Sequence, residues 1–313
     1  MFSPHRSQPR PSPVLHTHLV PPDAHGPAAT DPHSEAVAQA AGIIVRSLDT
    51  LEELRACVEL QHEVWGREYD DAVPASLLHV VSHIGGIVAG AFAADDELVG
   101  FVFGISGIKN GEVVHWSHEL GVRASARDAG VGRMLKQFQR AELARRGIST
   151  MFWTFDPLMA KNAHLNLNRL GARVEEYVEN MYGTTGSPLH HGLATDRFVV
   201  SWSTHADPTD ASSTAHTIVD DFARYPVVSA EPRADDVAVD LGSVVRNRES
   251  VFLLEVPTDI ERTPAASRAA WQISLRTSFE HALRSGYAVT GLHRDAVASR
   301  SFYVLELSAE VKP

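Results

Sequence analysis

The chain has 313 residues, 44% hydrophobic and 21% charged, so it is long enough to bury a sizeable core in one or two domains. Its formal net charge of −11 argues against a nucleic-acid partner, because binding a phosphate backbone needs clustered Lys and Arg. The single cysteine, Cys57, excludes a disulfide framework and a thiolate metal cluster. No apolar run approaches the roughly 18 residues of a membrane span, and no secretory signal is evident, so we expect a cytoplasmic protein without a membrane partner.

Residues 1–41 are rich in Pro, His, Ala and Ser, and we expect a disordered tail there. A short strand at 43–48 then starts the first domain, 42–203. Asp49 or Thr50 caps a helix that runs to about Trp65, and Pro74 starts a second helix. His79 and His83 have a spacing that can share a metal, but no third ligand is evident, so we expect no metal site.

Three antiparallel strands are predicted next, with Asn110-Gly111 as the strongest hairpin signal in the chain. An amphipathic helix opens at Gly130 and Gly132 and ends near Gly147. The strands of this domain are expected at 84–93, 98–105, 113–122, 149–155, 173–182 and 197–203, with a further helix at 159–170.

A polar linker is predicted at 204–216, followed by a C-terminal extension at 217–313. The extension shows a strand–helix–strand–strand pattern that is too small for an independent domain. We expect it to pack on the main domain. Its elements are predicted at 251–256, 264–285, 287–292 and 302–307.

The turn between a strand ending near Val122 and the helix after Gly132 carries the main functional signal. Two glycines allow backbone N–H groups to approach a ligand without Cβ interference, and a helix N-terminus presents unpaired donors with a partial positive charge. This combination suits a phosphate. The turn is therefore interpreted as a diphosphate cradle.

The segment Arg127-Asp-Ala-Gly130-Val-Gly132, placed after a three-strand meander and before a helix, resembles the signature Arg/Gln-x-x-Gly-x-Gly/Ala of the GNAT superfamily of N-acetyltransferases. The resemblance covers about residues 43–203. Within this superfamily, the chain resembles a group of predicted acetyltransferases whose acceptor substrate is not settled. It implies an α+β fold of the GNAT type: a mixed, mostly antiparallel sheet flanked by helices, here with a C-terminal β-α-β-β extension.

The resemblance also implies acetyl-CoA as the acyl donor and transfer of an acetyl group directly to the amine of a small molecule or peptide. Many proteins of this superfamily are dimers, so a homodimer is open. Backbone N–H groups would cradle the pyrophosphate, the edge of Leu120–Val122 would pair with the pantetheine arm, and Asn162 would lie beside the far end of that arm. The cradle residues would be Arg127, which forms the turn, and Asp128, Ala129, Gly130, Val131, Gly132 and Arg133. The acceptor would approach over the loop with Trp65, Glu68, Tyr69, Asp70 and Asp71.

Acetyl transfer needs a neutral amine, a donor for the developing oxyanion and a proton for the leaving thiolate. His118 and Glu119 are the candidate bases, and strand alternation predicts that only one of them faces the site. The backbone N–H of Val122 is the candidate oxyanion donor. Many superfamily members carry a Tyr four residues before the helix-ending Gly as the acid, where this chain has Leu167; Tyr182 or Tyr177 would have to substitute, or solvent would supply the proton.

Two other functions remain open. One is a catalytically silent acyl-CoA-binding or interaction module, which the missing Tyr favours. The other is an NAD-binding oxidoreductase, because Gly130-Val-Gly132 is part of the dinucleotide fingerprint and Asp156 stands near the expected ribose-binding position. Against it, Leu135 replaces the third Gly, and hairpins replace the required βαβ alternation.

Overall fold

A computed structural model describes residues 42–67, 69, 71–183, 193–205, 224–229 and 240–308. These residues form two sheets. The larger sheet has the order β1-β2-β3-β4-β5-β7-β6, and only the β4–β5 pair in it is parallel. Its strands are β1 (Ile44–Ser47), β2 (Ile87–Phe92), β3 (Leu98–Lys109), β4 (Glu112–Val122), β5 (Thr150–Phe155), β6 (Arg173–Val178) and β7 (Arg197–Ser203).

The mixed, mostly antiparallel sheet confirms the fold class predicted from the sequence. It is also the opposite of a doubly wound dinucleotide-binding sheet, whose strands are mostly parallel. Asn110 and Gly111 both have positive φ, 55° and 84°, as a two-residue hairpin turn between β3 and β4 requires.

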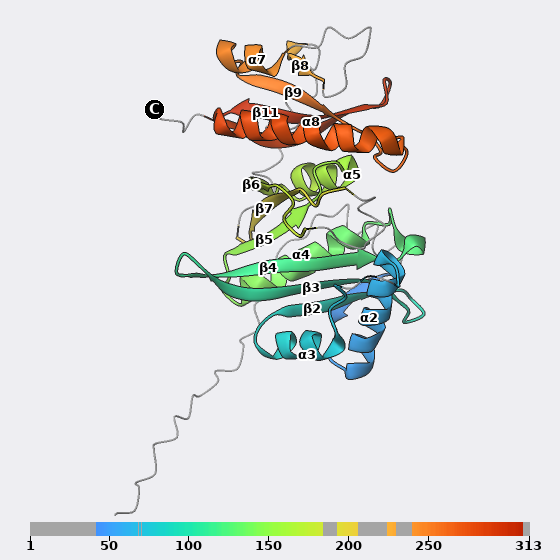
Figure 1. Ribbon diagram of the computed structural model, residues 1–313. Helices are drawn as coiled ribbons and strands as arrows, with labels where there is room; N and C mark the ends of the chain where they lie inside the picture. Colours follow the sequence, from blue (N-terminus) through green and yellow to red (C-terminus); the bar gives the residue numbers. More distant parts are fainter. Residues whose placement is uncertain are drawn as a thin grey trace, which may run out of the picture. The chain divides into compact units, whose positions relative to one another are not determined.

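Helices cover both faces of this sheet (Figure 1). On one face, α2 (Leu51–Trp65) and α3 (Ala75–His83) bury Leu54 and Leu78 against Phe101 and Phe103 of β3. Thr50 caps α2 in a reciprocal arrangement in which the Glu53 side chain accepts from the Thr50 backbone N–H. On the other face, α4 (Val131–Arg145) packs apolar side chains against Val99 and Val102.

The segment after β5 differs from the regular helix that the sequence predicts at 159–170. One α-helical turn, α5 (Ala160–Ala163), continues into a π-helix, η2 (His164–Arg169), in which the Leu170 N–H donates to Leu165 O at 2.9 Å. A short 3₁₀ turn, η1 (Ala124–Ala126), precedes α4.

The second sheet has the order β10-β11-β9-β8 and belongs to the C-terminal extension. Its elements are β8 (Val227–Val228), α7 (Leu241–Asn247), β9 (Val251–Val256), α8 (Ala265–Arg284), β10 (Tyr287–Asp295) and β11 (Arg300–Leu307). The predicted β-α-β-β pattern is present, together with two elements that were not predicted, β8 and α7.

The extension contacts the second half of the main sheet. Phe198 of β7 packs edge-on against Phe279 of α8, with ring centroids 4.7 Å apart, and the Tyr303 hydroxyl donates to Pro157 O at 2.8 Å. The Asn168 side chain exchanges two hydrogen bonds of 3.0 Å with the backbone of Leu292. The predicted tail at 1–41 and most of the predicted linker at 204–216 lie outside the described residues, so that division of the chain remains a prediction.

Candidate active site

A gap opens between β4 and β5, the two parallel strands at the centre of the sheet. They pair only at His115 with Met151 and at Trp116 with Phe152, although β4 continues to Val122. The Arg123 N–H donates to Val99 O of β3 at 2.9 Å, so strand alternation turns the N–H of Val122 toward the gap. An extended ligand can therefore pair with the edge of β4 at the residues predicted for it.

The N-terminus of α4 lies beside this edge. Gly130 is its N-cap in a left-handed conformation, φ +80°, without a side-chain cap, and the first helical bond runs from Met134 N–H to Gly130 O. The N–H groups of Val131 and Gly132 thus have no intrahelical acceptor. A Cβ on Gly130 would meet no atom within 4 Å, whereas one on Gly132 would lie 3.6 Å from Leu120 of β4. Open space and donors at a positive helix end fit a phosphate group.

The turn that leads into α4 is held from both sides. The Arg127 side chain donates to Val122 O at 3.3 Å, which ties the turn to the end of β4. Asp128, with φ +66°, forms an ion pair with Lys161 of α5. Asn162 is the next residue of α5 and is exposed, so its predicted place beside a ligand remains a prediction.

A β-bulge changes which side chains face the acceptor side. In the β3–β4 ladder, Phe103 pairs with Glu119 and Gly104 pairs with Ser117, which leaves His118 as an extra residue in β4. Ser117 faces α4, whereas Glu119 faces the side of α2, where its carboxylate accepts from Tyr69. The His118 ring lies edge-on to Phe103 on that same side, with centroids 5.9 Å apart. The expectation that only one of His118 and Glu119 faces the site is therefore wrong, because the extra residue breaks the alternation.

Glu119 is a buried carboxyl with spare hydrogen-bonding capacity. Only 7% of the residue is exposed, and the Tyr69 hydroxyl donates to its Oε1 at 3.3 Å. Its Oε2 has no hydrogen-bond partner among the described residues. Burial raises the pKa of Glu119 to about 7, the Tyr69 hydrogen bond opposes this shift, and the charge of Asp71 adds to it. The group can therefore exchange a proton near neutral pH.

His118 titrates lower than an ordinary histidine. Partial burial lowers its pKa, and the nearby Asp71 carboxylate opposes that shift. The ring is neutral at pH 7 and can accept a proton, so the chemistry leaves both bases open.

Aromatic side chains line the acceptor side. The Trp65 ring lies 5.3 Å from that of Tyr69 and packs edge-on against Phe101. Burial and the charges of Glu119 and Asp71 raise the pKa of Tyr69, so it stays a hydrogen-bond donor. Two further residues predicted for the acceptor loop, Glu68 and Asp70, lie outside the described residues.

The two candidate acids lie in different places. The Tyr182 hydroxyl is 3.1 Å from Thr154 Oγ1 of β5, and Tyr182 is close enough to Tyr69 to contribute to the raised pKa of Tyr69. Tyr177 instead donates to Asp196 at 2.6 Å and packs against Phe279 of the extension. Tyr177 is therefore excluded as the substitute acid, and Tyr182 remains.

Leu167, at the position where a Tyr was sought, is a core residue. It is buried, and its neighbour Asn166 accepts a 3.0 Å hydrogen bond from the Trp153 indole N–H. Neither side chain can supply a proton to a leaving group.

A buried polar network beneath the gap escaped the sequence analysis. Lys136 and Gln139 of α4 both contact Ser117 and, through it, the bulged part of β4. His115 continues the network toward Ser106 of β3. The sequence signal that could have indicated this network is the spacing of its polar residues. His115 and Ser117 are two apart in β4, and Lys136 and Gln139 are three apart in α4.

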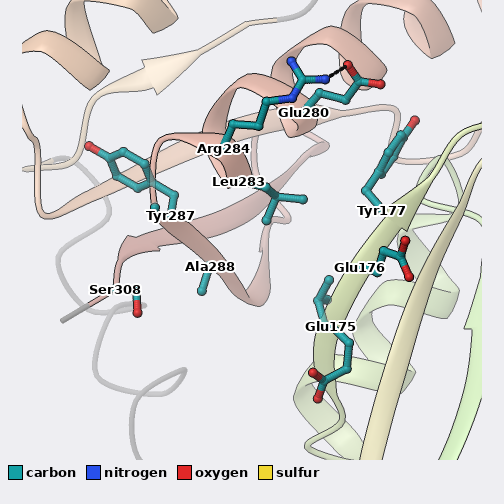
Figure 2. Close-up of a pocket in the computed structure, with 11 residues that line it drawn as sticks. Glu175, Glu176, Tyr177, Glu280, Leu283, Arg284, Tyr287, Ala288 and Ser308 are labelled. Atoms are coloured by element: carbon teal, nitrogen blue, oxygen red, sulfur yellow. Dashed lines mark hydrogen bonds and ion pairs between the residues drawn. The ribbon is translucent and has the colours of Figure 1, made fainter. Parts of the chain in front are cut away.

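The described residues also contain a cavity of about 570 Å³ away from the gap. Figure 2 shows it between Glu175, Glu176 and Tyr177 of β6 and a second wall that includes Arg284 and Tyr287. Tyr177, a candidate acid, lines this cavity, but none of the other residues predicted for the site does. Arg284 is paired there with Glu280, so no convergent catalytic group marks this cavity as an active site.

In the part of the chain that is described, no group of three or more His, Cys, Asp and Glu side chains comes together to hold a metal ion. His83 Nδ1 instead lies 2.8 Å from His79 O. The helices described also include none with the length and apolar character to cross a bilayer.

Several solved acetyltransferase structures are similar to part of this chain. The ribosomal-protein-S18-alanine N-acetyltransferase of Escherichia coli matches at 16% identity and a TM-score of 0.41, over 53% of this chain and 96% of its own. A putative acetyltransferase of Salmonella typhimurium, solved with acetyl-CoA, matches at 17% and 0.41, over 53% and 98%. An aminoglycoside 6′-N-acetyltransferase solved with coenzyme A matches at 19% and 0.40, over 53% and 99%.

The similarity to these structures covers about half of this chain. No protein-family model and no curated protein matches the sequence. At such low identity the activities of those proteins do not transfer to this chain, whose function must be argued from its own geometry.

Proposed function

We propose that this chain is an acetyl-CoA-dependent N-acetyltransferase that moves an acetyl group directly to an amine of a small molecule or peptide. The observation that carries the proposal is one continuous path. The N-terminus of α4, which has no side-chain cap, lies against Leu120 on the open edge of β4. The residue directly before Leu120 is Glu119, whose carboxyl is buried.

The donor half of the site suits coenzyme A. Backbone N–H groups from Asp128 to Arg133 would hold the pyrophosphate, Leu120 and Val122 would pair with the pantetheine arm, and Asn162 would lie at its far end. Acetyl-CoA, when bound, supplies an activated acyl thioester. The N–H of Val122 points toward the gap and would stabilise negative charge on an oxygen there.

The acceptor half suits an amine. Asp71 and Glu119 provide negative charge for an ammonium group, and Trp65 and Tyr69 provide apolar contact, with Glu68 and Asp70 completing the loop in sequence. Glu119 is ionised above about pH 7 and can take the proton through its unpartnered Oε2. His118 is the alternative base. Tyr182 is the acid proposed for the departing thiolate.

One observation favours a second function, a catalytically silent acyl-CoA-binding module. Leu167 is buried where many GNAT enzymes carry a tyrosine acid, and the substitute Tyr182 comes from a different segment, where its hydroxyl contacts Thr154 of β5. Such a module would keep the cradle and the β4 edge and would lack turnover.

Ligand-dependent unfolding and thiol release together separate these functions. We expect acetyl-CoA to stabilise the protein by about 2.7 kcal/mol at 100 times its Kd, NAD to have no effect, and at least one member of a panel of alkylamines, amino acids and peptides to release coenzyme A thiol. Stabilisation by acetyl-CoA without turnover on any amine would favour the silent module. Stabilisation by NAD alone would contradict both the acetyltransferase and the acyl-CoA-binding module.

A further inference from the structure

Lys136 is a buried lysine without an anionic partner. Only 6% of it is exposed, and it forms no ion pair with a carboxylate among the described residues. Its Nζ donates to Ser117 Oγ at 2.8 Å and lies 4.2 Å from the centre of the Trp153 ring. Burial lowers the pKa of Lys136 well below its ordinary value. A residue this costly to bury calls for a specific reason.

Each hydrogen bond of this network has one assignable donor and one assignable acceptor. The Ser117 hydroxyl donates to Gln139 Oε1 at 2.7 Å, so its oxygen accepts from Lys136. Ser106 donates to Gly85 O at 3.1 Å, so it accepts from His115 Nδ1, and the other ring nitrogen of that histidine accepts from the Gln139 amide at 3.4 Å.

This order of donors needs His115 in its neutral form. Burial, with Lys136 and Arg146 nearby, lowers the pKa of His115 to about 3. Space for the ring comes from Gly104, where a Cβ would lie 2.2 Å from His115 Nε2. The hydrogen bonds of the network thus agree with one assignment of donors and acceptors, which is how a polar network specifies a structure.

The network ends where β4 changes face. In a regular strand, Ser117 and Glu119 would lie on the same face, because side chains two apart share one. Here Ser117 is fixed to α4 and Glu119 to Tyr69 on the opposite side, and the extra residue between them is His118.

We infer that Lys136 is a positioning residue: with Gln139 it holds Ser117 against α4, maintains the β4 bulge, and thereby keeps His118 and Glu119 together on the acceptor side. This inference rests on the proposed function, because it assigns the pair to catalysis. Lys136 itself faces away from the acceptor side and touches no acceptor group.

The test replaces Lys136 by Met, which keeps length and suits burial but removes the donor to Ser117. Lys109→Met is the matched control, since Lys109 also lies 4.2 Å over an aromatic ring of β5, that of Phe152, but on the exposed end of β3. Ser117→Ala removes the other half of the contact and is the milder change if Lys136→Met folds poorly.

For Lys136→Met and Ser117→Ala we expect acetyl-CoA affinity within about twofold of the parent, because neither side chain belongs to the cradle. We expect kcat to fall roughly tenfold to a hundredfold, as for other misplaced catalytic groups. The double variant should be no worse than the poorer single variant, because both remove one contact. Lys109→Met should behave as the parent.

Two further readouts separate positioning from a general loss of stability. In its buried site Glu119 faces Tyr69 and Asp71 from the loop, Cys57 from α2 and His118 on its own strand. If Glu119 leaves that site, its pKa falls, and the acidic limb of the kcat/KM–pH profile should move below pH 7. Amide hydrogen exchange at 117–119 should become at least about tenfold faster without a matching change across β2 and β7.

An unchanged pH limb and unchanged exchange at 117–119 in both variants would overturn the inference and leave the proposed function standing. If the parent transfers acetyl to no amine, the proposed function fails. Faster exchange at 117–119 would then still support the role of Lys136 in holding the bulge, and unchanged exchange would remove that role as well.

Discussion

At the scale of single residues, the proton on Glu119 links activity to stability. Its pKa is about 7 in the folded chain against an ordinary value of 4.5, so the folded state keeps a proton that the unfolded state loses first. The free energy of unfolding therefore decreases as pH rises from about 4.5 to about 7, and the deficit persists above pH 7. The same burial that makes the carboxyl a useful base makes it a destabilising one.

Replacing Glu119 by Gln should change both properties in opposite directions. Between pH 4 and pH 8, Glu119→Gln should gain on the order of 2–3 kcal/mol in unfolding free energy relative to the parent. Its kcat/KM should fall by about 10²- to 10⁴-fold and lose the rise near pH 7. Urea unfolding at several pH values and pH–rate profiles measure these effects. Glu112→Gln, at the exposed start of the same strand, is the control, and parallel stability curves for parent and Glu119→Gln would contradict an elevated pKa.

At the scale of elements, the junction of β4 and α4 separates two roles of glycine. Gly130 has φ +80°, so any other residue there is strained by about 1–2 kcal/mol whether or not a ligand binds. Gly132 has no such restriction, and a methyl group there would make an ordinary contact with Leu120. Position 132 is therefore the better place to test ligand binding without disturbing the fold.

Gly132→Ala should retain acetyl-CoA binding within about threefold, since it adds no charge and leaves the backbone donors in place. Gly132→Glu should lower affinity by about a hundredfold or more, because a carboxylate would occupy the space for the pyrophosphate at the helix N-terminus. Calorimetric titration with coenzyme A measures affinity, and thermal unfolding checks that both variants fold. Equal affinity of the two variants would show that the diphosphate binds elsewhere.

At the scale of the whole molecule, the extension shares its core with the main sheet. Phe198 contacts Phe279 and Tyr303, and the buried carboxylate of Asp196 accepts two hydrogen bonds, of 2.8 and 2.9 Å, from Arg276 of α8. Asp196 is only 3% exposed. Such contacts imply that the main sheet and the extension unfold together.

Arg276→Leu should destabilise the protein by about 3 kcal/mol, because it leaves a buried carboxylate without its cation. Arg284→Leu, on the same helix, removes only an exposed pair with Glu280 and should cost less than about 1 kcal/mol. Denaturant unfolding should give one transition for the parent and both variants. Two separate transitions, or equal losses for the two arginines, would mean that the extension is an independent unit.

The sequence indicates the features that depend on local chemistry. Asn110-Gly111 marks a hairpin because both residues adopt positive φ, and Gly130 marks a helix start because only glycine takes that conformation without strain. The strand–helix order then specifies the mixed sheet. These signals fix the element order and place Leu120, Val122 and Gly132 beside one another.

The features that escaped prediction depend on contacts between distant segments. A bulge at His118 is set by where Ser117 and Glu119 find partners on α4 and on the loop after α2, and periodicity in β4 alone cannot reveal those partners. The buried Lys136 looks like any surface lysine in an amphipathic pattern. Residue spacing also did not indicate that Tyr177 would pack against Phe279 of the extension and not lie beside the gap.

The π-helix at His164–Arg169 changes how this chain should be aligned with others. A π-turn adds one residue to a helix, so counting back four residues from Gly171 falls one residue short of the position that the same count reaches in an uninterrupted helix. Leu167 stands four residues before that glycine, whereas Asn166, which bonds to Trp153, stands five before it. An alignment of this segment needs a one-residue gap within 164–169, and a motif search with fixed spacing will compare the wrong side chains.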